Sequence, residues 1–291
     1  MFCYDGFIVR EHLCVMGYCT LRSQLQHSNT KTPTYVELWH YLIAIIGSFL
    51  AGGINTLAGN GSAITLTILT EVMGLPGNLA NGTNRLGVFT QSSASTWVFW
   101  REGKLNWQRS WAFVVFSSIG AIVGALVAVW ISSDQFYAVF RYLMVFMLFV
   151  LLFKPERWLR NTDVDRPLKL WAIIPLCLAL GFYGGFIQMG MGIFFLAVMV
   201  LAARYSLTES NAVKSAMVVI YTFLAILIFQ WQGLIDWKIG SIMAVGQMLG
   251  GYLAAVYAAK SPQANLWAHR LLVAVVILST IKMFNLYKIF F

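Results

Sequence analysis

Apolar and charged positions follow one another along this chain in long blocks, and the first block is the one around which the rest is organised. Residues 38–70 contain no Asp, Glu, Lys or Arg, a run longer than the ~20 residues with which an α-helix crosses a bilayer. The run is interrupted at Gly59-Asn60-Gly61-Ser62. Because lipid offers no hydrogen bonds, irregular backbone at membrane depth survives only where protein or a water-filled cavity covers it. We therefore interpret the interruption as a broken helix, which in transporters is the usual substrate site.

A second block repeats this pattern. Residues 170–203 again lack charged side chains and are again interrupted by glycines. Several matches in order at a nearly constant offset indicate an internal duplication, and paired interrupted segments in two halves point to a transport site. The matches, at an offset near 130–132, are Gly59-Asn60-Gly61 with Gly190-Met191-Gly192, Leu75 with Leu207, Ala80 with Ala212, and Gly103–Trp107 with Gly233–Trp237.

These blocks predict an all-α polytopic membrane protein with two homologous halves. Each half has about four transmembrane helices and a short half-span helix after its glycine-rich break. We expect an N-terminal tail over 1–36, a first transmembrane repeat over 37–154, a cytoplasmic connector over 155–168 and a second repeat over 169–291. The individual segments are predicted at Leu38–Leu57, Ala63–Met73 (the short helix), Asn78–Trp100, Ser110–Ser132, Gln135–Phe153, Ile239–Ala259 and Leu266–Lys288.

Two topologies fit this pattern. If the short helices dip in and return, the chain makes eight crossings and the halves are parallel. If the short helices complete a crossing, the chain makes ten and the halves are inverted. The enrichment of Lys and Arg in cytoplasmic loops favours eight crossings, which we take as the working count, whereas the frequency of inverted repeats among transporters favours ten.

Composition supports a membrane protein and argues against other classes. Hydrophobic residues make up 59% of the chain and charged residues 11%, with a mean hydropathy of +0.72, whereas soluble domains average about 25% charged residues. Most of the Lys and Arg behind the net charge of +9 lie in short loops, as in the cytoplasmic loops of membrane proteins, which does not suggest nucleic acid. No CxxC, metalloprotease, Walker or nucleophile-elbow motif is present. We expect no enzyme activity, cofactor or metal.

Basic residues inside the apolar segments are the strongest candidates for chemistry. A charge at the centre of a membrane helix costs at least ~2.5–3.5 kcal/mol, so it usually faces the interior and has a partner. There are three such cations, Arg85, Arg141 and Lys214, but only two carboxylates in the same segments, both near segment ends. These carboxylates, Glu71 and Glu209, are also candidate proton-relay residues. The surplus of positive charge suggests an anionic ligand beside Arg85 and Lys214; the alternative, favoured for Arg141, is that the cations snorkel to an interface.

Neutral donors lie around both breaks. A short helix starting after each break would direct N–H groups and a positive dipole end into the membrane interior, an arrangement that binds anions. The alternative is that glycines and small polar residues only allow helices to pack closely. The candidate substrate-binding residues are Asn55, Asn60, Gly61, Ser62, Asn81, Thr83, Asn84, Arg85, Gln91, Gln188, Gly192, Lys214 and Ser215.

An ordered set of short motifs carries a family resemblance. They are Ala51-Gly52-Gly53, Gly59-Asn60-Gly61-Ser62, Leu75-Pro76, Ala80-Asn81-Gly82-Thr83-Asn84-Arg85, Arg101–Trp107, and the second-half copy from Gly190-Met191-Gly192 to Asp236-Trp237. The set resembles the sulfite exporter TauE/SafE family, also called the toluene sulfonate uptake permeases, over about Leu38 to Phe284. The resemblance implies transport of sulfite, sulfonates and related sulfur-containing anions.

We therefore predict a secondary transporter in which a small anion binds between the two breaks, near the membrane midplane, while the halves rock around it. Its partners are then the small anionic substrate and the lipid bilayer, in the inner membrane of a bacterial cell. A homo-oligomer is compatible with the sequence, and a nucleic-acid partner is not expected. The alternative from another class is a membrane scaffold or assembly factor that carries nothing, whose breaks are packed without a water-accessible cavity.

Overall fold

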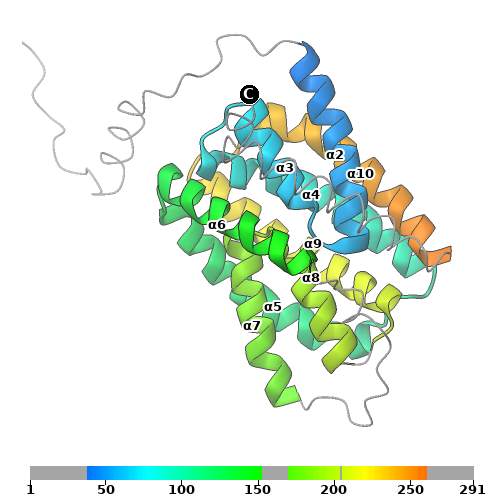
Figure 1. Cartoon of the computed structure of the whole chain (residues 1–291). Helices are drawn as coiled ribbons and strands as arrows, with labels where there is room; N and C mark the ends of the chain where they lie inside the picture. Colours follow the sequence, from blue (N-terminus) through cyan, green and yellow to red (C-terminus); the bar gives the residue numbers. More distant parts are fainter. Residues whose placement is uncertain (1–37, 153–169, 204, 261–291) are drawn as a thin grey trace, which may run out of the picture. The chain divides into compact units, whose positions relative to one another are not determined.

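The computed structural model describes residues 38–152, 170–203 and 205–260, and every regular element within these ranges is a helix (Figure 1). Four of the helices are long and apolar enough to cross a membrane, which confirms an all-helical membrane protein. The count of eight or ten crossings stays a prediction. Three predicted segments lie outside the described residues: the tail over 1–36, the connector over 155–168 and the span at Leu266–Lys288.

The first part of the chain contains the predicted break and short helix. Gly59 ends the first helix with φ +79°, a left-handed conformation that glycine adopts without strain. The short helix finishes in a π-helical turn, and Gly74 and Pro76 separate it from the next helix. The elements are α2 (Leu38–Ala58), α3 (Gly61–Thr67), the π-helical segment η1 (Ile68–Val72), α4 (Gly77–Arg101), α5 (Trp107–Trp130) and α6 (Ser133–Leu152).

The second part has the same order of elements and nearly the same lengths. The short helices α3 and α8 have 7 residues each, α4 and α9 have 25 each, and α5 and α10 have 24 each. Each second-part element from α8 onwards begins 130 positions after its counterpart. The elements are α7 (Leu170–Phe186), α8 (Met191–Ala197), η3 (Val198–Ala202), α9 (Leu207–Trp231) and α10 (Trp237–Lys260).

Contacts between helices fix the direction in which each short helix runs. Gly61, at the start of α3, packs against Ala51 of α2. Ile68, at the start of η1, packs against Gly47, which lies one helical turn closer to the N-terminus of α2. The short helix α3 therefore runs back alongside α2, the helix that precedes it, and Figure 1 shows α3 beside α2.

The helices α4 and α9 pack against each other in opposite directions. Gly82, early in α4, packs against Phe229, late in α9, and Phe89 lies 6.0 Å from Phe223, centroid to centroid. The α4 helix is too polar for a lipid-facing span, and most of it is buried. The polar side chains of α4 thus lie in the interior of the bundle, where α4 packs against the apolar helix α9.

Glycines four residues apart bring helix backbones into direct contact. A Cβ added to Gly246 or Gly250 of α10 would lie within 2.6 Å or 1.9 Å of a backbone oxygen of α2. Gly120 and Gly124 of α5 approach α7 in the same way. Small residues at this spacing are typical of membrane helix interfaces, where close packing replaces the hydrophobic effect. Large apolar side chains are left on the outer faces, among them Leu42, Ile46, Val123, Leu227 and Leu253.

The two breaks meet at a single glycine pair. The Gly192 amide donates to the Gly59 carbonyl at 3.2 Å, and a Cβ on Gly192 would lie 2.4 Å from the Gly59 Cα. No side chain larger than hydrogen fits between these backbones. The sequence therefore needs glycine at both positions to bring α2 and α8 together.

We expect Gly192→Ala to destabilise the protein, because the added methyl overlaps the Gly59 backbone. Overpacking of this kind costs about 1–3 kcal/mol, and about 2–4 °C of melting temperature accompanies each kcal/mol in a protein of this size class. Gly59→Ala should cost more, since it adds the strain of a left-handed alanine, about 1–2 kcal/mol. The measurement is the melting temperature of purified protein in detergent.

Gly103→Ala is the matched control, because Gly103 has φ +65° and nothing lies within 4 Å of the added Cβ. It isolates the cost of the left-handed backbone. Equal melting temperatures for Gly59→Ala and Gly103→Ala would contradict the close approach of the breaks.

Candidate functional site

The C-terminal turns of α2 and α7 end inside the bundle, and each is bound by an asparagine and a basic residue from a helix of the other part of the chain. We call these two groups the α2 clamp (Asn211 and Lys214 of α9) and the α7 clamp (Asn81 and Arg85 of α4). The last carbonyls of a helix have no partner within the helix, and inside a membrane no water is available to satisfy them.

In the α2 clamp, Lys214 donates from Nζ to the carbonyl oxygens of Asn55 at 3.0 Å and Thr56 at 2.9 Å. Its third bond goes to Asn211 Oδ1 at 2.7 Å. The amide nitrogen of Asn211 reaches the Leu57 carbonyl at 3.5 Å. Three consecutive carbonyls at the end of α2 thus have partners on α9.

In the α7 clamp, Arg85 donates to the carbonyl oxygens of Gly184 and Gly185, both at 2.7 Å. Asn81 donates from Nδ2 to the Phe186 carbonyl at 2.8 Å and accepts from Arg85 at 3.3 Å. The guanidinium carbon also lies 5.4 Å from the centroid of the Phe229 ring, within cation–π range. Three consecutive carbonyls at the end of α7 thus have partners on α4.

The two clamps share one design. In each clamp, the asparagine side-chain oxygen accepts a hydrogen bond from the cation, and its nitrogen donates to a carbonyl at the helix end. The cation donates to the carbonyls of the two preceding residues of the same helix. Positive charge at a helix C-terminus also complements the helix dipole. Arg85 is 0% exposed and Lys214 4%, so both point into the bundle, and the snorkelling alternative fails for these two. Arg141 is exposed, as its snorkelling interpretation requires.

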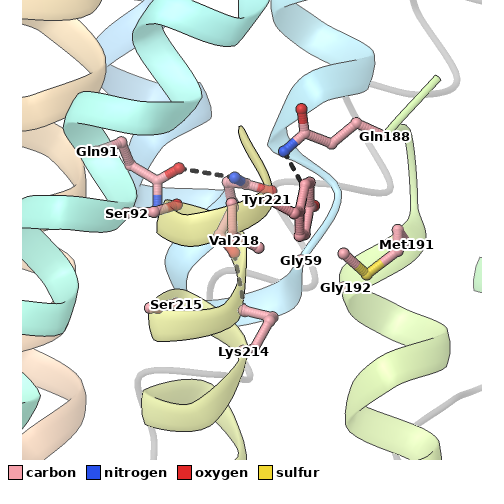
Figure 2. A pocket seen from close by; sticks show the side chains of 11 residues that line it. Gly59, Gln91, Ser92, Gln188, Met191, Gly192, Lys214, Ser215, Val218 and Tyr221 are labelled. Atoms are coloured by element: carbon pink, nitrogen blue, oxygen red, sulfur yellow. Dashed lines mark hydrogen bonds between the residues drawn. The ribbon is translucent and has the colours of Figure 1, made fainter. Parts of the chain in front are cut away.

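A polar pocket lies beside the α2 clamp, between the two breaks (Figure 2). The pocket has room for about one water molecule. The residues that line it come from α2, α4, α9, the first turn of α8 and the breaks that follow α2 and precede α8. They are Asn55, Gly59, Gln91, Ser92, Gln188, Met191, Gly192, Lys214, Ser215, Val218 and Tyr221.

Hydrogen bonds hold the amide side chains of the pocket in place. Asn55 donates to Gln91 Oε1 at 2.7 Å, and Gln91 donates to the Thr56 hydroxyl at 2.8 Å. On the opposite wall, Gln188 donates to the Tyr221 hydroxyl at 3.2 Å, and Figure 2 shows these two side chains pointing toward one another.

Two further features of the pocket are characteristic of functional sites. Gln188 has φ +64°, and a left-handed conformation in a residue other than glycine costs about 1–3 kcal/mol and tends to occur at functional sites. Its Oε1 accepts from Arg85 at 3.0 Å, which links the pocket to the α7 clamp. The Ser215 hydroxyl is buried and makes no hydrogen bond with another described residue.

The structure brings part of the predicted set together. Thr83 accepts from the Asp236 amide and Asn84 from the Thr65 hydroxyl, so these two stabilise the bundle elsewhere. Asn60, Gly61 and Ser62 are buried but do not line the pocket, because α3 turns back along α2. The predicted residues that line the pocket are Asn55, Gln91, Gln188, Gly192, Lys214 and Ser215.

The two candidate relay carboxylates lie outside the pocket. Glu71 is exposed on η1. Glu209 accepts from the Ser206 amide at 2.9 Å in a capping box at the start of α9, a local structural role. Their part in a proton relay stays a prediction.

The sequence analysis missed Asn211 and Tyr221. Asn211 could have been found, because it lies 130 positions after Asn81, at the same offset as the helices that carry them. Tyr221 has no such signal, because a tyrosine among apolar residues is also a common core residue.

Comparisons with known proteins give a consistent picture. The family model described as "Sulfite exporter TauE/SafE" matches residues 44–283. The chain is similar to "Probable membrane transporter protein ORF9" of Sinorhizobium sp, 28% identical over 76% of this chain and 85% of the relative. It is also similar to a "Probable membrane transporter protein" of Haemophilus influenzae, 28% identical over 71% and 80%, and to "Probable membrane transporter protein YfcA" of Escherichia coli K12, 24% identical over 72% and 77%. No solved structure matches the chain.

We expect Asn211→Ala and Lys214→Met to be coupled in a double-mutant cycle, because both side chains bind each other and the same helix end. Coupling energies between residues in one hydrogen-bond network are about 0.5–3 kcal/mol. The measurement is the unfolding free energy of the two single variants and the double variant in detergent.

Asn106→Ala is the control partner for Lys214→Met. Asn106 caps α5 by accepting from the Arg109 amide, so its loss costs about 1 kcal/mol at a site with no shared partner. Its effect should add to that of Lys214→Met within about 0.5 kcal/mol. Additivity of the Asn211 and Lys214 variants as well would contradict the α2 clamp.

Proposed function

The chain belongs to the TauE/SafE sulfite exporter family, and from that premise we propose that it carries a small sulfur-containing anion, such as sulfite or a sulfonate, through the pocket between its two helix breaks. As a membrane transporter of this family it is an integral membrane protein that acts on a small molecule in a lipid bilayer. The identity of the anion is the part that goes beyond family membership.

The position of Lys214 carries the proposal. Its ammonium group lines the pocket, and its acceptors are neutral oxygens. A buried cation with neutral partners leaves a positive potential that an anion can neutralise, because electrostatic interactions are strong where water is excluded. The Ser215 hydroxyl and the amides of Asn55 and Gln91 supply neutral donors on the same walls. Three-oxygen anions such as sulfite need several donors around one centre.

A transport cycle requires this pocket to open. A sulfite or sulfonate group is larger than the single water for which the pocket has room, so the substrate enters only when the two parts of the chain move apart around it. Broken-helix transporters achieve this by rocking one repeat against the other about a fixed central site. The Gly59–Gly192 contact lies next to the pocket and joins the two breaks, which makes it a suitable pivot.

The arrangement of helices supports an inverted duplication. The equal lengths of corresponding elements support descent from a repeated unit. The opposite directions of α4 and α9 support halves that are inverted with respect to each other. The return of α3 along α2 means that the broken helix and its short partner enter and leave on one side.

We expect Lys214→Met to reduce anion uptake about 10–100-fold, because it removes the buried positive charge at the pocket wall. The attraction between two unit charges in a poorly solvated site amounts to a few kcal/mol, and about 1.4 kcal/mol corresponds to each factor of ten. The measurement is uptake of labelled sulfite and of a panel of sulfonates into proteoliposomes that contain equal amounts of folded protein. Lys260→Met, an exposed charge at the end of α10, is the control and should transport at the wild-type rate. Wild-type protein that carries none of these anions would favour the scaffold alternative.

Ser215→Ala separates substrate binding from stability. The Ser215 hydroxyl makes no hydrogen bond with another described residue, so its removal should leave the melting temperature unchanged. A lost hydrogen bond of about 0.5–1.5 kcal/mol to the substrate would raise KM about 2–10-fold. An unchanged KM would place the substrate away from this wall of the pocket.

A further inference from the structure

The ammonium group of Lys214 is fully used by the end of α2. An ammonium has three N–H donors, and three oxygens receive them: the carbonyls of Asn55 and Thr56 and the side chain of Asn211, at 2.7–3.0 Å. No carboxylate is among these acceptors, so the site is formed by neutral oxygen dipoles that converge on one positive charge.

Oxygens at the C-terminal end of a broken membrane helix are the group that coordinates a coupling cation in many secondary transporters. Here the same kind of oxygen set is already filled by a side chain. We propose that the last turn of α2 and Asn211 form a monovalent-cation site that the chain occupies with its own Lys214 ammonium group. The protein thereby carries a tethered cation at a kind of site where many secondary transporters bind a cation from solution.

The α7 clamp makes the contrast clear. Arg85 fills the equivalent oxygens at the end of α7, but it is fully buried and does not line the pocket. Its planar guanidinium spreads its donors over five acceptors, a geometry that no simple cation reproduces. Lys214 is a compact point charge at the pocket wall. Only the α2 clamp is therefore both shaped for a small cation and reachable from the pocket.

Two consequences follow. The wild-type protein has no vacancy for Na⁺ at this site, so Na⁺ should not stabilise it there. If the proposed function holds, on which this second consequence rests, anion transport should also not require Na⁺. Truncating the lysine should empty the site and turn it into a binding site for a free primary ammonium ion, because the oxygen geometry is preserved by the backbone of α2.

The test is the melting temperature of purified Lys214→Ala protein in detergent, at constant ionic strength, in choline, sodium or methylammonium chloride. Lys214→Ala should melt below the wild type in choline. Methylammonium at about 100 mM should raise its melting temperature saturably by about 2–4 °C. Lys214→Met is the matched control, because its side chain fills the vacated space; it and the wild type should show no rise.

The proposal is overturned if neither methylammonium nor Na⁺ raises the melting temperature of Lys214→Ala above its value in choline. A Na⁺-specific rise in the wild type would also overturn it, because the site would then not be filled from within. Should Lys214→Ala not fold, this wild-type comparison decides alone: equal melting temperatures in sodium and choline support the tethered cation.

These measurements are independent of transport. Methylammonium stabilisation of Lys214→Ala in a protein that carries no anion would refute the proposed function and leave the cation site standing. Uptake of sulfite by the wild type with no cation effect on Lys214→Ala would do the reverse.

Discussion

The bonds from two buried cations to the ends of two helices are the interactions on which the rest of this structure depends. A helix that stops inside a membrane leaves carbonyl oxygens with no water to bind, and each unsatisfied group costs several kcal/mol in lipid. Lys214 and Arg85, each with an asparagine, provide those partners. Without them α2 and α7 would have to continue across the membrane, and the polar space between their ends would close.

The clamps also bind the two parts of the chain to each other. The end of α2 is completed by α9 and the end of α7 by α4, so neither broken helix is satisfied by its own part alone. The glycine pair between the breaks has the same effect at the backbone level, since Gly59 and Gly192 leave no space for a side chain. A pocket at this junction is therefore formed by both parts at once, as alternating access about a central site requires.

The two cations differ in their position relative to the pocket. Arg85 lies behind the pocket wall and donates a hydrogen bond to the lining residue Gln188, whereas Lys214 forms part of the wall itself. The α7 clamp thus stabilises a helix end away from the pocket. The α2 clamp stabilises a helix end and also places a positive charge at the pocket wall. Loss of either cation should destabilise the fold, so only measurements that separate stability from uptake can assign their roles.

The pattern of charges and glycines by itself determined the class of protein, the positions of the breaks and the presence of two cations, Arg85 and Lys214, inside apolar segments. These features follow from local rules: the length of an apolar run, the backbone freedom of glycine and the cost of a charge in lipid. The helices with predicted bounds that lie within the described residues, from Leu38–Leu57 to Gln135–Phe153 and at Ile239–Ala259, agree with those observed to within a few residues at their ends. No bounds were predicted for α7, α8 and α9.

Only the tertiary structure decided what the cations touch. The sequence analysis placed Arg85 and Lys214 beside an anionic substrate because the cations outnumbered the carboxylates at the segment ends. It did not consider that backbone carbonyls of a distant helix could serve as their partners. Lys214 and Asn55 are separated by 159 positions, and nothing in the local pattern of either segment specifies their contact. The directions of α3 and α9, and hence which residues share a wall of the pocket, likewise depend on how whole helices pack, because the sequence fixes the period of each helix but not its neighbours.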